Sequence, residues 1–284
     1  MNYQLTRDCE TRLKVIKKKL NELKVKSLLD FGGAEGYFAQ NLKEYNPVLV
    51  DDQRDVNISG IEFIKKRMNA NDIKELLKRD FDCVLLLSIL HHFDNYGEIF
   101  NIFLNDSKYL FIEILADNEG KQIKNFHISK YLKNLVKNQN YELLTKTKAH
   151  LSDHLRPLYY VTKKEQNWIK GIVQNGTKNS TEHMTRNSGK IYGCLGNKIF
   201  PGSLNVYVGD LKLTNPIQLK VPEYKLPYDF YPCNFMGLDS FIMRPPGTKH
   251  GELAEIVAEV KLRDVFGLED GNEVYLSVQE KYLG

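Results

Sequence analysis

Apolar residues in the first half of the chain follow two different spacings. Leu13, Ile16, Leu20 and Leu23 recur every three or four positions, which predicts an amphipathic helix over residues 8–24. A short apolar run at 27–30 then leads into glycines. A helix-like segment at 37–45 and a second strand-like run at 48–50 follow. This alternation indicates strands joined by helices.

Later segments continue the same order. Residues 83–87 and 110–114 are continuous apolar runs typical of buried strands, and residues 73–78 have helical spacing. Residues 61–67 fit either a strand or a helix. Strands that alternate with helices predict a parallel sheet with right-handed crossovers. We expect 141–145 and 157–162 to form antiparallel strands that close it.

The pattern changes after Lys163-Lys164-Glu165. Strand-like runs from about Ile169 onward are separated by Gly, Pro and Asn, and eight of the nine prolines lie after residue 150. Such spacing favours a β-rich domain. We therefore predict two domains, residues 1–165 and 166–284, of which the first is α/β and Rossmann-like.

Composition narrows the function classes. The 40 basic and 36 acidic residues give a net charge of +4, too mild to indicate a nucleic-acid partner. The first ten residues are polar, unlike a signal peptide, and the longest apolar run is too short to span a membrane. Four cysteines without a CxxC pair disfavour disulfide and zinc frameworks, so reduced thiols and a cytoplasmic location are expected.

A glycine-rich turn follows the first strand. The sequence from Asp30 through Gly32 to Gly36 reads DxGxxxG rather than the GxGxxG of dinucleotide sites. Glycine lets a ligand approach the backbone closely, and an acid at the strand end suits a ligand with a cationic amino-acid group. The alternative is a plain glycine turn.

Polar residues at the ends of the next segments suit a nucleoside. Asp51 ends the second strand, where a carboxylate can accept hydrogen bonds from both ribose hydroxyls, and Asp52 competes for this role. The Asn69–Asp72 segment offers a place to read an adenine edge, but it fits a helix N-cap equally well.

The buried strand at 83–87 leads directly into a polar segment, Ser88 to His92. Open α/β sheets bind ligands at the carboxyl ends of their strands. Two adjacent histidines, His91 and His92, just beyond a strand are therefore candidates for function rather than for structure alone.

Taken in order, these segments resemble the class I methyltransferase family over residues 8–164, with Ala34 in place of a middle glycine often found in the loop. The resemblance implies S-adenosylmethionine (AdoMet) as methyl donor. It implies the amino-acid end near Asp30, Gly32 and Gly36, the ribose on Asp51, and the adenine near Asn69, Ala70 and Asn71. It places the sulfonium beside Leu87, Ser88 and the rest of the segment up to His91.

The resemblance also places His91 or His92 toward the acceptor. If the acceptor is a hydroxyl, a neutral histidine suits a general base, and an anionic acceptor needs none. Glu113, at the end of the 110–114 strand, is a second acceptor-side candidate for substrate binding. The alternative for Glu113 is a surface acid.

The second domain contains a turn followed by a strand, Leu195-Gly-Asn-Lys-Ile-Phe-Pro-Gly-Ser-Leu-Asn-Val206. Period 2 puts Ser203 and Asn205 on one face of that strand. A hydroxyl and an amide oxygen side by side can ligate Mg²⁺, which prefers oxygen. The alternative is a capped turn with two polar strand residues.

Four segments follow one another in the second domain, namely this turn, the Arg244–His250 segment, the Glu252–Ala258 strand and the KLR…GLEDGNEV ending. They occur in the order of the archaeal CTP-dependent riboflavin kinase family, which folds as a small β-barrel, and the second domain resembles that family. The resemblance covers about 168–284. It implies Mg²⁺ on Ser203 and Asn205, and acceptor contacts from Thr248 and Glu255, with Glu255 as candidate base. It also implies a CTP site formed by Gly176, Thr177, Lys178, Val260, Lys261, Leu262 and Arg263.

The leading hypothesis is a bifunctional enzyme. A kinase domain phosphorylates a hydroxyl of a small molecule or glycan, and the methyltransferase domain methylates the product or a nearby group. Bifunctional kinase–methyltransferases that cap O-antigen chains pair these activities with a different kinase fold. Two alternatives remain, independent reactions on one sugar-like substrate or a barrel that only binds the substrate. A nucleic-acid methyltransferase is a weaker reading.

Overall fold

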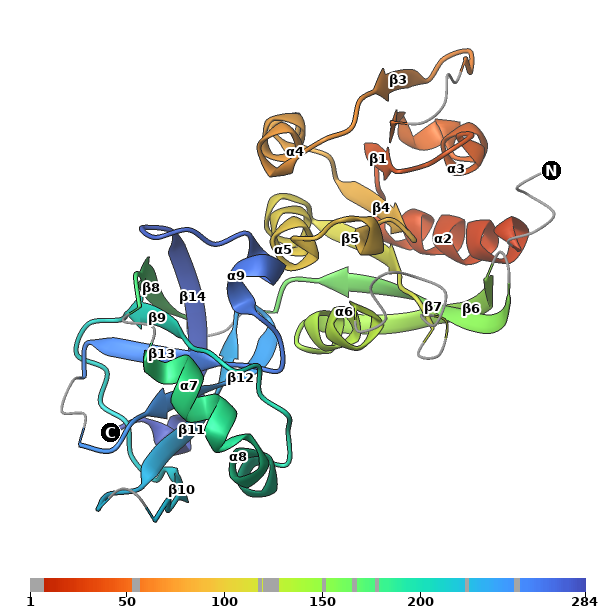
Figure 1. Ribbon diagram of the computed structural model, residues 1–284. Coiled ribbons are helices and arrows are strands. Elements are labelled where there is room, and N and C mark those ends of the chain that lie inside the picture. Colours follow the sequence, from red (N-terminus) through yellow and green to blue (C-terminus); the bar gives the residue numbers. More distant parts are fainter. Residues whose placement is uncertain are drawn as a thin grey trace. The chain divides into compact units, whose positions relative to one another are not determined.

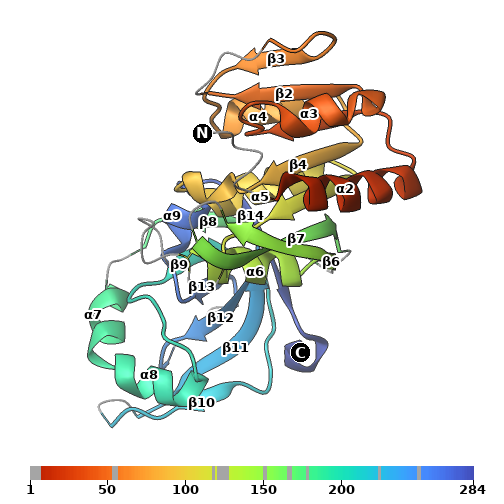
Figure 2. The ribbon, with the colours of Figure 1, turned by 90° about the vertical axis from the view of Figure 1, so that its right-hand side faces the viewer.

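The computed structural model describes residues 8–52, 57–116, 119, 128–149, 152–164, 168–176, 179–222, 225–247 and 251–284. The chain divides after Lys164 into two compact units, each with its own sheet. Figures 1 and 2 show the elements of both units.

The N-terminal unit contains a seven-stranded sheet in the order β3-β2-β1-β4-β5-β7-β6. The first five strands in this order are parallel, and β7 runs antiparallel to both β5 and β6. The strands are β1 (Leu28–Phe31), β2 (Pro47–Asp51), β3 (Glu62–Lys65), β4 (Cys83–Leu87), β5 (Tyr109–Glu113), β6 (Asn140–Ala149) and β7 (Ser152–Thr162).

Helices cover both faces of this sheet. Figure 1 shows α2 and α3 on one side and α4, α5 and α6 on the other, as right-handed crossovers require. The helices are α2 (Cys9–Leu23), α3 (Tyr37–Asn41), α4 (Ala70–Leu77), α5 (Tyr96–Asp106) and α6 (Ile128–Lys137), with single 3₁₀ turns at η1 (Lys43–Tyr45) and η2 (Leu90–His92).

The core explains why these segments fold as they do. All residues of β1 and β4 are buried, which accounts for their continuous apolar runs. On α2, Ile16 and Leu20 are fully buried and pack with Leu28 and Leu85 of the sheet. The ambiguous segment at 61–67 contains a strand, β3, rather than a helix. The predicted Rossmann-like sheet is confirmed.

The C-terminal unit is a closed antiparallel barrel. Six strands form the ring β11-β12-β13-β9-β8-β14, which closes because β14 pairs with both β8 and β11. A short seventh strand, β10, is attached to β11. The strands are β8 (Ile169–Gln174), β9 (Leu204–Tyr207), β10 (Ile217–Leu219), β11 (Tyr228–Phe235), β12 (Leu238–Arg244), β13 (Leu253–Val257) and β14 (Glu273–Val278).

The predicted barrel is confirmed, and it also carries helices that the sequence pattern did not indicate. These are α7 (Asn179–Arg186), α8 (Ser188–Leu195), α9 (Leu262–Phe266) and the 3₁₀ turn η4 (Glu280–Tyr282). Met184 and Ile191 of α7 and α8 pack on Tyr228, Phe230 and Met243 of the barrel. This cluster covers one outer face of the β-sheet.

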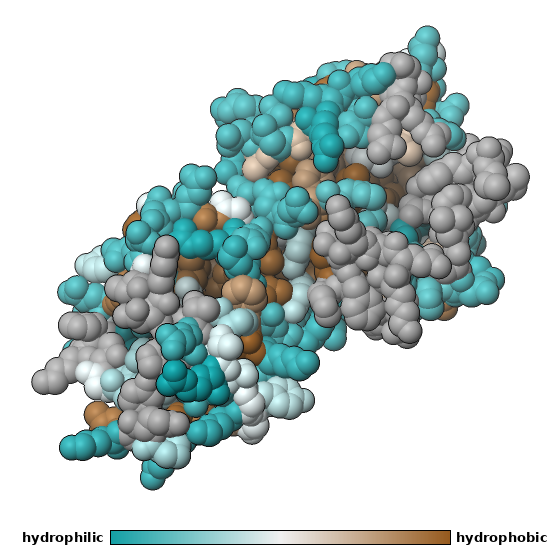
Figure 3. All heavy atoms as spheres, viewed as in Figure 1, coloured by the Kyte–Doolittle hydropathy of each residue, from teal (hydrophilic) through white to brown (hydrophobic). Residues whose placement is uncertain are grey.

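The surface seen in Figure 3 is mostly hydrophilic, with smaller apolar areas between the polar residues. None of the helices in the described ranges combines the length and apolarity needed to span a lipid bilayer. The expected absence of a nucleic-acid partner stays a prediction.

Candidate active sites

A cavity of about 610 Å³ opens at the carboxyl ends of β1, β2 and β4 in the N-terminal unit. This is the edge at which open α/β sheets bind ligands. Its lining includes seven of the residues expected from the sequence, namely Gly32, Asp51, Asn69, Ala70, Leu87, Ser88 and His92. Separate parts of the chain thus converge on one site.

The glycine turn packs too tightly for side chains. Gly32 has φ of +74°, and a Cβ there would lie 2.6 Å from Cγ1 of Ile89. A Cβ on Gly33 would lie 2.4 Å from Cδ1 of Leu49 and 2.5 Å from Oδ2 of Asp30. Gly32 therefore presents bare backbone to the cavity, which Ala34 of the same turn also lines and Gly33 does not. Gly36 begins α3 with φ of +74° and does not line the cavity.

Asp30 lies beneath this turn rather than on the cavity wall. Its side chain is 1% exposed and accepts a hydrogen bond from the N–H of Ala39 at 3.1 Å. Burial raises the pKa of Asp30 to about 7, with a further contribution from the nearby Asp51 carboxylate. The carboxyl group therefore titrates near neutral pH, where a cationic ligand would favour its charged form.

Asp51 and Asp52 both line the cavity. Oδ2 of Asp51 accepts a hydrogen bond from the N–H of Ala34 at 2.9 Å, so this carboxylate is tied to the glycine turn. Asp52 is exposed. Asp51 is therefore the better positioned of the two acids, and its ribose role stays a prediction.

Asn69 serves as a helix N-cap and also lines the cavity. Its side-chain oxygen accepts from the N–H of Asp72 at 3.0 Å, and the Asp72 carboxylate accepts from the N–H of Asn69 at 3.2 Å. The reading as a helix N-cap is confirmed, and the two bonds together form a capping box. The predicted adenine role is compatible with it, because Ala70 in the first turn of α4 also faces the cavity.

The two histidines differ in position. His92 is exposed and lines the cavity, whereas His91 is 9% exposed and does not. Their ring centroids lie 4.1 Å apart. His92 is therefore the histidine that a bound acceptor could reach directly.

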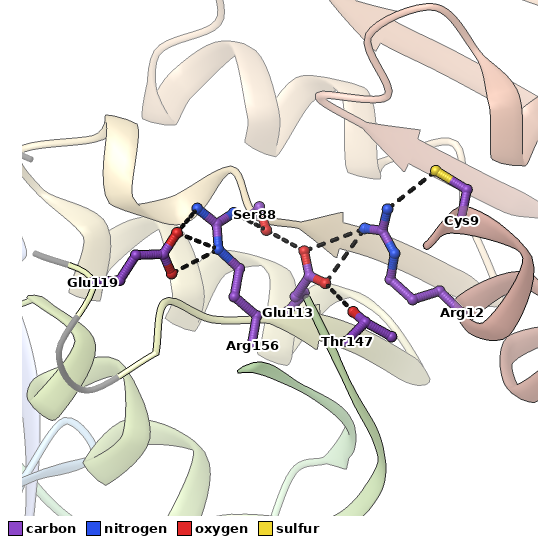
Figure 4. A network of polar contacts seen from close by, with 7 residues as sticks. All are labelled: Cys9, Arg12, Ser88, Glu113, Glu119, Thr147 and Arg156. Carbon is purple, nitrogen blue, oxygen red and sulfur yellow. Dashed lines mark hydrogen bonds and ion pairs between the residues drawn. The ribbon is translucent and has the colours of Figure 1, made fainter. Parts of the chain in front are cut away.

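Glu113 is not a surface acid, because it is 3% exposed and sits within a buried polar network (Figure 4). Arg12 donates to its Oε2 at 3.2 Å, Thr147 donates to its Oε1 at 3.2 Å, and Ser88 donates to Oε2. Arg156 in turn donates to Oγ of Ser88 at 2.9 Å. Glu113 thus lies behind the cavity wall, and its role in substrate binding stays a prediction.

The barrel has a second cavity of about 450 Å³. Its lining brings together residues expected for metal and nucleotide binding from three segments, namely Gly176, Ser203, Asn205, Val260, Lys261, Leu262 and Arg263. Three further expected residues, Thr177, Lys178 and Thr248, lie outside the described residues.

Glu255 does not line this cavity but contacts Ser203, which does. It lies opposite Asn205 across β13 and β9, and its Oε2 accepts from the hydroxyl of Ser203 at 3.0 Å. The amide nitrogen of Asn205 donates to the carbonyl of Asn175 at 3.4 Å, and its amide oxygen takes no part in this bond. Burial raises the pKa of Glu255, although the Ser203 hydroxyl and Arg244 oppose the shift. A carboxylate, a hydroxyl and an amide therefore form one oxygen-rich cluster.

A family model described as a methyltransferase domain matches residues 1–146, more than half of the chain. The chain belongs to this methyltransferase family. A second model, described as domain of unknown function DUF120 and named for CTP-dependent riboflavin kinase, matches residues 173–278. Both resemblances and their order along the chain are confirmed. A search of curated proteins found no significant match.

Solved structures similar to this methyltransferase chain have low identity. One is the bifunctional kinase–methyltransferase WbdD, with 20% identity, a TM-score of 0.44, and coverage of 72% of this chain and 50% of that chain. The chain thus spans about half the length of WbdD. Another is the methyltransferase domain of bacterial CtHen1-CN, with 12% identity and a TM-score of 0.39. This match covers 54% of this chain and 98% of that chain. The N-terminal domain of EvdMO1 with SAH bound has 14% identity and a TM-score of 0.38. This match covers 54% of this chain and 80% of that chain.

Several residues at the methyltransferase cavity escaped sequence reasoning. Phe31, the last residue of β1, and Phe93, which follows the 3₁₀ turn η2, add apolar walls. Arg12 carried a usable signal, because it lies four residues before Ile16 on the buried face of α2. A cation at an apolar position implies a buried anionic partner, here Glu113.

Proposed function

We propose that this chain is a bifunctional enzyme. Its N-terminal unit transfers the methyl group of AdoMet, and its barrel transfers a phosphoryl group from a nucleoside triphosphate, with CTP the expected donor, to a hydroxyl of a small molecule or glycan. The methyl group then goes to the phosphorylated product or a nearby group. Two consecutive sites on one chain raise the local concentration of the intermediate.

The observation that carries the kinase half is the oxygen cluster of Ser203, Asn205 and Glu255 beside the expected nucleotide segment. Mg²⁺ prefers oxygen ligands and retains water and phosphate oxygens, so a hydroxyl and an amide oxygen at the cavity fit such an ion. A bound Mg²⁺ would neutralise charge on the transferred phosphoryl group. Backbone N–H groups near Gly176, with Lys261 and Arg263, supply further positive character for phosphates.

In phosphoryl transfer, the acceptor hydroxyl oxygen bonds to the γ-phosphorus, the bond from that phosphorus to the β–γ bridging oxygen breaks, and the nucleoside diphosphate leaves. Glu255 accepts the hydroxyl proton. Its raised pKa suits this role, because a more basic carboxylate holds a transferred proton better.

In methyl transfer, an acceptor oxygen bonds to the methyl carbon while the carbon–sulfur bond breaks, and S-adenosylhomocysteine leaves. Asp51 holds the ribose, and the glycine turn at Gly32 contacts the amino-acid end. A phosphate oxygen needs no base because it is already anionic. A hydroxyl acceptor would pass its proton to His92, which is the histidine on the cavity wall.

The test is calorimetric binding of CTP, CDP and ATP with Mg²⁺ to the native protein and to Ser203→Ala. Magnesium-dependent binding of cytidine nucleotides that weakens at least tenfold in the variant supports the kinase. Equal binding of ATP would overturn the choice of CTP. Absence of binding by all three nucleotides would overturn the kinase.

A second candidate function keeps the methyltransferase and makes the barrel a substrate-binding module. One ion pair favours it, because the guanidinium of Arg263 already donates to the Asp270 carboxylate at 2.6 Å. Its charge is thus partly neutralised within the protein. Absence of nucleotide binding, with AdoMet binding intact, would favour this function.

A further inference from the structure

Ser88 occupies a backbone conformation that side chains disfavour. It directly follows β4, has φ of +63°, and is 6% exposed while it lines the methyltransferase cavity. Left-handed backbone crowds the Cβ of an L-residue, and glycine avoids this cost. Interactions elsewhere in the protein must therefore hold Ser88 in place.

Three hydrogen bonds anchor Ser88, and Figure 4 shows the two that involve its hydroxyl. Its N–H donates to the carbonyl of Glu113 at 3.2 Å, and its hydroxyl donates to the Glu113 carboxylate. Nη1 of Arg156 donates to the same hydroxyl at 2.9 Å. The hydroxyl therefore acts as both donor and acceptor toward buried charged groups, which form stronger hydrogen bonds than neutral groups do.

Both anchors are fixed by partners of opposite charge. The Glu113 carboxylate accepts hydrogen bonds from Arg12 and Thr147, each at 3.2 Å. Arg156 donates a hydrogen bond to Glu119 at 2.8 Å. The positive charges of the two arginines equal the negative charges of the two glutamates, so each buried charge has a partner of opposite sign. None of the five residues that surround Ser88 in this network lines the described cavity.

The position of Ser88 determines that of its neighbour over the glycine turn. Ile89 follows Ser88 directly, and its Cγ1 lies 2.6 Å from where a Cβ on Gly32 would be. Ile89 and Gly32 both line the cavity. A change in the backbone at Ser88 would therefore move the wall that faces the glycine turn.

We propose that Glu113 and Arg156 are positioning residues of the methyltransferase site, which act by holding Ser88 in its left-handed conformation. They connect β5 and β7 to the cofactor cavity without touching the ligand. This inference rests on the proposed AdoMet site. It assigns to Glu113 a role different from the substrate contact expected from the sequence.

The decisive comparison is Ser88→Ala against Ser88→Gly in the full chain, with S-adenosylhomocysteine binding measured by calorimetry. Both variants lose the hydroxyl, but only glycine adopts the left-handed conformation without anchors. We expect Ser88→Ala to bind about tenfold more weakly, which corresponds to about 1.4 kcal/mol. We expect Ser88→Gly to lose clearly less affinity than Ser88→Ala, because glycine adopts this conformation without the anchoring bonds.

A second pair of variants tests Glu113 itself. Glu113→Gln should weaken binding about tenfold in the native background and less than about twofold in the Ser88→Gly background, because glycine no longer depends on the anchor. The matched control is Thr147→Val, which removes one hydrogen bond to Glu113 but none to Ser88. Thr147→Val should lower the melting temperature and leave the affinity nearly unchanged.

Equal losses in Ser88→Ala and Ser88→Gly would overturn the proposal, since the hydroxyl would then contact the ligand itself. Native affinity in both variants would overturn it as well. If the native protein binds no S-adenosylhomocysteine, the proposed cofactor fails, and urea unfolding of the same variants still decides the positioning role. In that assay Ser88→Ala must be less stable than Ser88→Gly, and the reverse order would overturn the proposal.

Discussion

Glu255 lies directly opposite Asn205 across two barrel strands, with its carboxylate on the Ser203 hydroxyl. If Glu255 is the base, Glu255→Gln should reduce phosphoryl transfer about 10²- to 10⁴-fold and leave Mg²⁺–nucleotide binding within about threefold. Single-turnover transfer and calorimetry measure the two effects. Glu252→Gln, at an exposed residue of the same segment, is the matched control. Retained turnover in Glu255→Gln would exclude Glu255 as the base.

Because burial raises the pKa of Glu255, the pH profile of phosphoryl transfer should report it. The base works only when ionised, so the rate should fall with acidification through a pKa above the usual range of a glutamate. A profile without this acid limb would contradict the assignment.

If Asp51 binds the ribose as proposed, Asp51→Ala should weaken AdoMet binding about 10- to 100-fold, because the ribose hydrogen bonds are lost together with the anchor of Ala34. The barrel should stay folded, since Asp51 belongs to the other unit. Calorimetry of Asp51→Ala and Asp52→Ala side by side measures the effect. Loss of affinity only in Asp52→Ala would assign the ribose to that residue instead.

The pKa of Asp30, raised by burial from 3.8 to about 7, has two consequences for pH dependence. Folded protein holds this proton more tightly than unfolded protein, so Asp30 contributes most to stability below about pH 4. That contribution is lost as the pH rises through about 7. Asp30→Asn should flatten this dependence in urea unfolding measured between pH 5 and pH 8.

AdoMet affinity should depend on pH in the opposite direction. The ionised fraction of Asp30 increases between pH 6 and pH 8, because burial raises its pKa to about 7, and only the ionised form attracts a cationic amino group. Affinity should therefore rise across this range in the native protein and stay flatter in Asp30→Asn. The same slope in both proteins would remove Asp30 from the cofactor site.

Ala34→Gly should stabilise the methyltransferase unit by about 0.5–1 kcal/mol, because Ala34 has φ of +50°, where glycine is favoured. Ala39→Gly, in helix α3, is the matched control and should destabilise by about 1 kcal/mol. Scanning calorimetry measures both, with the relevant transition identified by its shift on adding S-adenosylhomocysteine. Destabilisation by Ala34→Gly would contradict the strain argument.

The sequence was most informative where burial is complete. β1 and β4 are buried throughout, so their apolar runs identified the strands and the cavity edge. β3 lies at the edge of the sheet and is only partly buried, so its pattern did not distinguish strand from helix. α7 is rich in Asn, Ser and Thr, which favour caps and turns, so its pattern carried little helical signal.

Long-range pairing limited what could be predicted of the sites. Asp51 ends β2 and Ser203 directly precedes β9, so the local sequence pattern was enough to single out both residues. The partnership of Arg12 with Glu113 joins residues 101 positions apart, and no local spacing encodes it. Glu255 was expected as an acceptor-side base, but its contact with Ser203 depends on which strands are neighbours in the barrel.

Closure of the barrel by β14 also has a consequence for how the C-terminal unit forms. Strand β14 bonds to β8, the first strand of the unit, so the ring joins segments from opposite ends of this part of the sequence. Such pairings lose chain entropy when the loop closes, before stabilising contacts form, and folding is therefore slower. The cavity between Gly176 and Arg263 should therefore appear in one late, cooperative step instead of growing strand by strand.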